Sequence, residues 1–164
     1  MLDIARQRIT AQNVLFEHFD IPISTDASTA ASITMPKNLS QGADGLISTL
    51  VLEHVPLSAF FHAAAALLRP GGVFLLTNMH SDMGGISQAG FVHPVTKIKI
   101  RPTSYAHTIP DVLNAAREAG FEVLGDEGMK EVAVTEDMVE SLGPRGRKWV
   151  GVQCWFGGCL RKVA

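Results

Sequence analysis

One stretch of the sequence, residues 44–77, constrains the fold more than any other part of the chain. It reads DGLISTLVLEHVPLSAFFHAAAALLRPGGVFLLT. Two short apolar runs, at 46–52 and 73–76, flank a segment at 56–68 that has helix-forming composition and opens with proline. Short apolar runs bounded by turn signals are typical of buried strands. The stretch therefore predicts a strand–helix–strand unit whose two strands are parallel.

Length and composition indicate one folded domain over residues 1–164. Hydrophobic residues make up 46% of the chain and charged residues 18%, which is too apolar for a disordered protein. The formal net charge of −2 provides no general attraction for nucleic acid or an anionic membrane. No apolar run has membrane-spanning length, and the first residues, MLDIARQR, do not resemble a signal peptide. We therefore expect a cytoplasmic protein that binds neither nucleic acid nor membrane.

Periodicity and turn signals predict further elements on both sides of the central stretch. They are a helix at 1–11, a strand at 14–19, a loop at 22–43, a helix at 108–120 capped by Thr108 and ended by Gly120, a strand at 121–124, a helix at 136–142 and a last strand at about 150–160 with a bulge at Gly157 and Gly158.

The segment 78–107 shows no clear helix and contains Gly84, Gly85 and two prolines. Within it, the run KIKIR at 97–101 alternates basic and apolar residues, which predicts a half-buried strand with one basic face. A long insertion between regular elements is usually a lid or a binding loop. We expect it to lie over a binding site, where the basic face would attract an anionic ligand or remain a solvated surface.

Cys154 and Cys159 fall in the predicted last strand. Their odd spacing places them on opposite faces of a regular strand, so they are poorly placed to form a disulfide. No histidine is close to them in sequence, so no metal site is expected there, and we expect both cysteines to act as small, buried hydrophobic residues.

The string VLEHVPLSAFFHAAAALLRPGGVFLLT resembles the fourth and fifth strand region of class I S-adenosylmethionine-dependent methyltransferases of the type 11/12-like group. IPDVLNAAREAGFEVLG resembles the helix and sixth strand that follow, and MLDIARQRITAQNVLFEHFDIP resembles the region around strand three. The resemblance implies an α/β fold with a three-layer Rossmann-like sheet, mostly parallel with an antiparallel last strand. It also implies S-adenosylmethionine as cofactor and a small-molecule methyl acceptor.

The chain departs from that family at its start. The family opens with a strand and a glycine-rich loop that approaches the cofactor, and neither is present here. We expect an N-terminally truncated version of the fold, lacking roughly 30 residues or more. The strand at 46–52 would then have an open edge. Either the strand at 14–19 moves beside it, or a second copy or partner chain covers it, or the chain is poorly soluble.

By the same resemblance, five residues are expected to bind the cofactor. Asp20 and Ile21 match the end of strand three, beside the adenine, and Ser48, Thr49 and Leu50 match the end of strand four, beside the methionine part. The alternatives are a turn role for Asp20 and ordinary packing for the other residues.

Two histidines are candidate catalytic bases. His54 follows Glu53 directly after the predicted strand, and His80 lies just past the next strand, at the ligand-binding end of such a sheet. Relatives that hold a metal here use Glu-x-x-Glu-His, but Leu50 occupies the first position, so no metal is expected. Glu53 and His54 are about equally well explained as a helix-start pair in which Glu53 complements the dipole.

The sequence therefore predicts methyl transfer to a small molecule. A second hypothesis is a non-catalytic remnant that acts as a binding or partner protein, or has no function. A nicotinamide-binding Rossmann domain is disfavoured because no GxGxxG motif opens a helix after a strand.

Overall fold

The computed structural model describes residues 2–18, 39–87 and 90–163. Its central stretch forms the predicted strand–helix–strand unit: β1 (Ala43–Thr49), α2 (Leu57–Leu67) and β2 (Leu68–Met79). Pro56 is the N-cap residue of α2. β1 and β2 pair in parallel, so this part of the prediction is confirmed.

β2 begins earlier than predicted, because the RPGG sequence lies inside the strand as a bulge rather than before it. Ala43 pairs with Leu68 and Gly45 pairs with Val73, so the six residues 68–73 of β2 face the three residues 43–45 of β1. A side chain at Gly72 would place its Cβ 2.9 Å from the carbonyl oxygen of Arg69. Glycine at this position therefore lets the bulge close against its own backbone.

The strand order of the main sheet is β1-β2-β7-β5, with β6 also paired to β7. The remaining strands are β5 (Phe121–Val123), β6 (Lys130–Ala133) and β7 (Gln153–Lys162). β7 is antiparallel to β2, β5 and β6. The other strands of this sheet thus share one direction and the last strand opposes them, as predicted.

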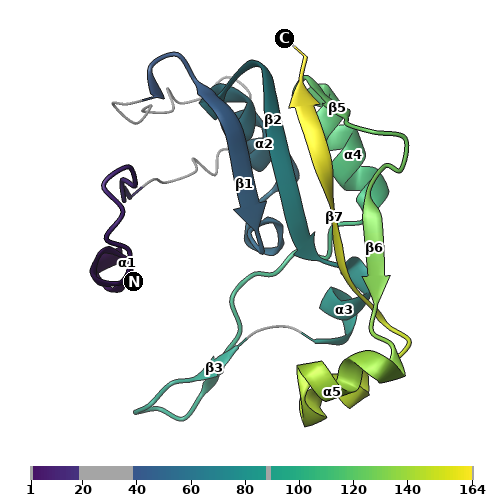
Figure 1. Cartoon of the computed structure of the whole chain (residues 1–164). Coiled ribbons are helices and arrows are strands. Elements are labelled where there is room, and N and C mark those ends of the chain that lie inside the picture. Colours follow the sequence, from purple (N-terminus) through teal and green to yellow (C-terminus); the bar gives the residue numbers. More distant parts are fainter. Residues whose placement is uncertain (1, 19–38, 88–89, 164) are drawn as a thin grey trace.

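Helices α2 and α4 (Ile109–Glu118) pack side by side on one face of this sheet, as Figure 1 shows. α4 is the best-signalled element of the sequence, and Thr108 caps it through a hydrogen bond from the Asp111 backbone N–H. The core between helices and sheet is aromatic and aliphatic. Its largest fully buried side chains are Phe61, Phe74, Phe156, Leu52, Leu68, Leu76, Leu160 and Val112.

Short elements complete the described chain. They are α1 (Leu2–Arg8), η3 (Leu52–His54), α3 (Ser81–Ile86), a hairpin of β3 (Phe91–Val92) and β4 (Lys99–Ile100), η4 (Glu136–Met138), α5 (Val139–Leu142) and η5 (Pro144–Trp149). α1 buries none of its residues and lies apart from the sheet in Figure 1. Within the described ranges, no helix is long and apolar enough to cross a membrane.

The prediction of a strand at 14–19 is wrong for residues 14–18, the part that the structure describes, because they form no strand and join no sheet. Leu15 is 68% exposed, and the Phe16 carbonyl accepts a hydrogen bond from Arg6 instead of a ladder partner. A single apolar run cannot form a stable strand without a neighbour. In the described chain β1 is therefore an edge strand, and residues 14–18 do not pair with it.

Two other predictions need correction. The segment 78–107 contains the helix α3 despite Gly84 and Gly85, because His80 caps its first turn. Gly157 and Gly158 form no bulge, since they pair in register with Thr77 and Leu76. A Cβ at Gly158 would lie 2.6 Å from the Met129 sulfur, so the small residue accommodates a packed side chain.

Candidate functional site

The carboxyl ends of β1 and β2 lie side by side, and polar residues follow both strands. In open α/β sheets, ligands bind outside these strand ends. Thr77 Oγ1 donates to Thr49 Oγ1 at 3.0 Å, and the Leu50 backbone N–H donates to the Thr77 carbonyl at 3.1 Å. Leu50 has φ of +56°, a left-handed conformation that is unusual for a leucine. Such strain is concentrated at functional sites.

The structure brings together three of the five predicted cofactor residues. Ser48, Thr49 and Leu50 are consecutive at the end of β1. The Ser48 hydroxyl is buried and has no hydrogen-bond partner within the described residues. Asp20 and Ile21 lie outside the described residues.

Glu53 and His54 occupy the η3 turn directly after β1. The Glu53 side chain is only 10% exposed, whereas the His54 side chain is 53% exposed. His54 Nε2 lies 3.7 Å from Glu53 Oε1. Glu53 Oε2 is buried without a hydrogen-bond partner in the part of the chain that the structure describes. The pair thus consists of an enclosed carboxylate and an accessible imidazole.

A segment distant in sequence contacts the η3 turn that holds Glu53, and local sequence signals do not predict this contact. The Tyr105 backbone N–H donates to the Glu53 carbonyl at 2.9 Å. His107 Nε2 lies 3.0 Å from the Val55 carbonyl, and the Tyr105 and His107 rings stack with centroids 5.1 Å apart. The end of the 78–107 segment therefore lies against η3 and is hydrogen-bonded to its backbone.

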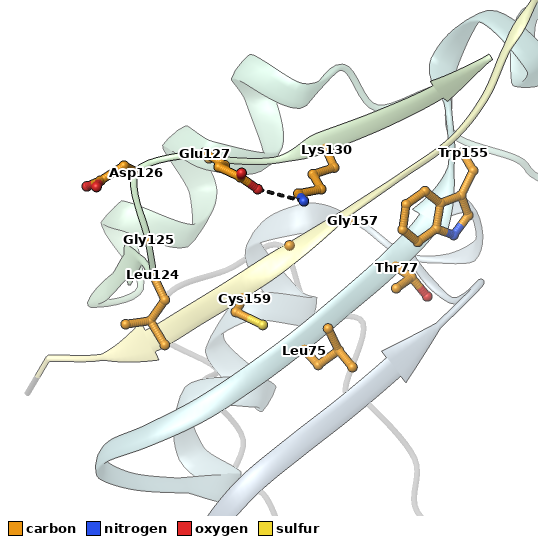
Figure 2. A pocket seen from close by; sticks show the side chains of 12 residues that line it. Leu75, Thr77, Leu124, Gly125, Asp126, Glu127, Lys130, Trp155, Gly157 and Cys159 are labelled. Atoms are coloured by element: carbon orange, nitrogen blue, oxygen red, sulfur yellow. Dashed lines mark ion pairs between the residues drawn. The ribbon is translucent and has the colours of Figure 1, made fainter.

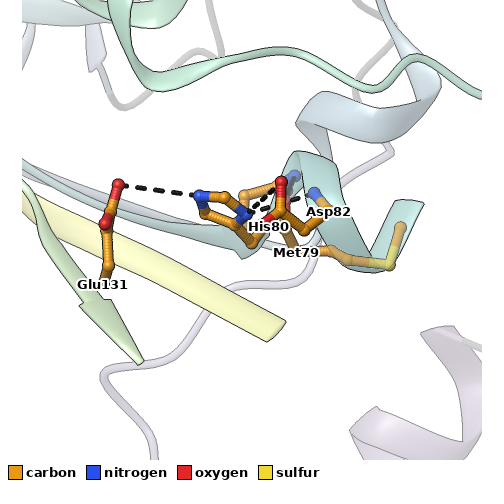
Figure 3. A network of polar contacts seen from close by, with 5 residues as sticks. Met79, His80, Asp82 and Glu131 are labelled. Carbon is orange, nitrogen blue, oxygen red and sulfur yellow. Dashed lines mark hydrogen bonds and ion pairs between the residues drawn. The ribbon is translucent and has the colours of Figure 1, made fainter. Parts of the chain in front are cut away.

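His80 follows β2, at the predicted end of the sheet, and both of its ring nitrogens face protein groups (Figure 3). Nδ1 accepts a hydrogen bond from the Asp82 backbone N–H at 3.1 Å and caps α3. Nε2 lies 3.6 Å from Glu131 Oε1, and the ring meets Phe156 edge to face. Because Nδ1 accepts, the neutral ring carries its proton on Nε2, toward Glu131.

The basic run at 97–101 forms an exposed hairpin rather than a half-buried strand. β4 covers only Lys99 and Ile100, and Ile98 is exposed on the same hairpin. The hairpin extends away from the sheet in Figure 1. Its two strands pair only with each other, so no larger sheet buries the apolar residues.

A hollow of about 390 Å³ lies over β2 and β7, beside the loop before β6 (Figure 2). Trp155, Leu75 and Cys159 give it apolar walls, and Glu127 and Lys130 form an ion pair at its margin. None of the predicted site residues that the structure describes lines it. Topology therefore places the site at the strand ends rather than in this hollow. Within the described residues, no three His, Cys, Asp or Glu side chains form a group able to hold a metal.

The fold and the strand-end site define a class: the chain has the fold of class I S-adenosylmethionine-dependent methyltransferases. It is similar to a methyltransferase of Emericella nidulans, with 58% identity over 118 residues that cover 70% of this chain and 41% of the relative. The chain thus spans less than half the length of that curated relative. No family model matches the sequence.

Solved structures confirm the fold. A methyltransferase from Listeria monocytogenes, described as S-adenosylmethionine dependent, superposes with a TM-score of 0.67 at 12% identity, over 100% of this chain and 76% of that one. Another from Mesorhizobium loti gives a TM-score of 0.53 at 17% identity, over 77% of this chain and 64% of that one. The predicted resemblance to class I methyltransferases is therefore confirmed at the level of homology and fold.

Proposed function

We propose that this chain carries the acceptor side of an S-adenosylmethionine-dependent methyltransferase that acts on a small molecule. The observation that carries the proposal is the strand-end site, where a strained Leu50, an enclosed Glu53 and an accessible His54 meet on a methyltransferase fold. The similarity to the methyltransferase of Emericella nidulans supports methyl transfer in general but does not identify the acceptor.

The buried polar atoms at this site fit a bound ligand. Ser48 Oγ and Glu53 Oε2 are both enclosed and lack partners in the described residues. Orphaned polar atoms cost roughly 1–3 kcal/mol each, so a ligand that satisfies them gains that amount. Ser48, Thr49 and Leu50 would hold the methionine part of the cofactor. When bound, S-adenosylmethionine supplies an electrophilic methyl group.

His54 is the better placed of the two candidate bases. Its side chain is 53% exposed, so its imidazole is accessible to take a proton from an acceptor hydroxyl or amine. His80 uses Nδ1 to cap α3 and turns Nε2–H toward Glu131. A proton can reach His80 only after that cap is broken, so we propose His54 as the base and His80 as a residue that shapes the site.

The segment 78–107 would act as a lid over the acceptor. Its end is already fastened to η3 through Tyr105 and His107, next to His54. The exposed hairpin at 91–100 precedes that attachment in the chain and carries Lys97, Lys99 and no acidic residue. An acceptor with a negatively charged group suits this surface.

Calorimetric titration with S-adenosylmethionine tests the proposal. We expect the wild-type chain to bind it, and a His54→Asn variant to bind equally well but to lose methyl transfer once an acceptor is found. An acceptor screen with radiolabelled methyl donor supplies that second readout. A folded chain that binds no S-adenosylmethionine would contradict the proposal and favour a non-catalytic partner protein.

The free edge of β1 supports a second copy as a partner. In the described chain, its outer backbone groups pair with no strand, and Ile47 is 72% exposed beside them. Unpaired edges readily accept another strand. We expect a concentration-dependent dimer by light scattering, weakened by Ile47→Lys. A monomer at all concentrations would argue that β1 remains unpaired.

A further inference from the structure

We propose that Glu53 is a ligand-binding residue whose carboxylate receives a positive charge of the cofactor's methionine part. This inference deepens the proposed function and rests on it. Glu53 was not among the residues expected to bind the cofactor. Its side chain combines three properties that no other carboxylate of the described chain shares: burial, an unpartnered oxygen and a position at the carboxyl end of β1.

Burial is the first step of the argument. Among the acidic residues that the structure describes, Glu53 alone is buried. Removing a carboxylate from water costs several kcal/mol unless a donor or cation compensates. A carboxylate that only complements the dipole of a helix start can do so at the surface, without this desolvation cost.

The second step is the lack of compensation. Glu53 Oε2 has no hydrogen-bond partner in the described residues, and His54 Nε2 lies 3.7 Å from the other oxygen, Oε1, which is beyond hydrogen-bond range. The backbone carbonyl of Glu53, by contrast, is satisfied by Tyr105. The fold therefore fixes the backbone of Glu53 and leaves one oxygen of its buried carboxylate without a hydrogen-bond partner among the described residues, so this oxygen could accept a hydrogen bond from a ligand.

The third step is the charge of the ligand. S-adenosylmethionine carries two cations in its methionine part, a sulfonium and an ammonium, and both groups suit an enclosed carboxylate. The residues expected to hold this part, Ser48–Leu50, lie at the carboxyl end of β1, and Glu53 follows them three residues after Leu50, in η3. Methyl transfer removes the sulfonium charge and leaves neutral sulfur in S-adenosylhomocysteine. A carboxylate at the sulfonium would therefore favour the methyl donor over the product.

The binding experiment compares wild type with Glu53→Gln, which keeps the shape and removes the charge. Titrations use S-adenosylmethionine and S-adenosylhomocysteine. We expect Glu53→Gln to weaken binding of S-adenosylmethionine roughly tenfold or more. A smaller loss for S-adenosylhomocysteine assigns the contact to the sulfonium, and an equal loss assigns it to the ammonium. Unchanged affinity for both ligands overturns the proposal. Glu122→Gln, a half-exposed carboxylate on β5, is the matched control.

A stability measurement keeps this proposal distinguishable from the proposed function. Without ligand, the buried carboxylate of Glu53 with its unsatisfied oxygen should destabilise the chain, so Glu53→Met should raise Tm by roughly 2–4 °C. A wild-type chain that binds neither ligand contradicts the proposed function. The Tm comparison of the Glu53 variants then tests separately whether Glu53 is a structural residue. A lower Tm for both Glu53→Met and Glu53→Gln shows that Glu53 is a structural residue and overturns the inference.

Discussion

The side chain of Asn78 fastens the end of β2 to the turn after β1, because its Oδ1 accepts a hydrogen bond from the Leu52 backbone N–H at 3.1 Å. Asn78 is 3% exposed and Leu52 is fully buried. The bond thus holds η3, and with it Glu53 and His54, against the neighbouring strand. The geometry of the site depends on this contact although Asn78 itself has no proposed chemical role.

Replacing Asn78 with Leu should destabilise the chain by about 1–3 kcal/mol, because the buried Leu52 N–H loses its acceptor. Denaturant unfolding followed by circular dichroism measures the change. Asn114→Leu is the control, since Asn114 is an exposed residue of α4 whose side chain accepts a hydrogen bond from the exposed Arg117. An equal loss of unfolding free energy in both variants would show that the hydrogen bond from Leu52 to Asn78 adds no particular stability.

The parts of the fold that were predictable from sequence are those with local signals. α4 has its cap at Thr108 and its glycine at Gly120, with φ of +84°, and the strand–helix–strand unit has its flanking turns. These signals lie within a few residues of the element that they specify. The strand order then follows from the family resemblance rather than from any single residue.

The features that were mispredicted or missed share a physical cause: each depends on contact with a segment that is distant in the sequence. Residues 14–18 have the composition of a strand but no neighbouring strand in the described chain. The alternating pattern of 97–101 predicts burial that only a facing sheet could provide. The backbone hydrogen bond from Tyr105 to Glu53 requires residue 105 to return to η3, and the contact of His80 with Glu131 requires β6 to pair with β7. None of these pairings has a sequence signal of its own.

Replacing Thr108 with Ala should cost about 1 kcal/mol through loss of the α4 cap. The Thr108 hydroxyl accepts from the Asp111 backbone N–H at 3.3 Å and donates to the Asp111 carboxylate at 2.6 Å. Thermal unfolding measures the change, and Thr108→Ser should restore most of the loss because it keeps the hydroxyl. Equal loss with Ser and Ala would point to the methyl group instead of the cap.

The two cysteines should differ in reactivity. Burial raises the pKa of the Cys154 thiol, so at pH 8 to 9 a smaller fraction is present as the reactive thiolate than for an ordinary cysteine. Cys159 lines the open hollow beside Trp155. We expect iodoacetamide to modify Cys159 first, and the rate at Cys154 to rise further as pH increases.

Mass spectrometry of Cys154→Ser and Cys159→Ser variants assigns each rate to one thiol. Both cysteines are free, so no reductant is needed to expose them. Faster labelling of Cys154 at pH 8 would contradict the effect of burial on its pKa.

Gly157 should tolerate no side chain, although it lies in a regular strand. A Cβ there would be 2.9 Å from the Leu76 carbonyl oxygen and 2.9 Å from the Trp155 ring. Backbone of β2 cannot yield without breaking the β2–β7 ladder, so Gly157→Ala should destabilise the chain by about 1–3 kcal/mol. Gly85→Ala is the matched control, because a Cβ at Gly85 meets nothing within 4 Å and alanine favours a helix. Urea unfolding should therefore show a lower midpoint for Gly157→Ala and an equal or higher one for Gly85→Ala, and similar midpoints for both would mean that β7 shifts to accept the methyl group.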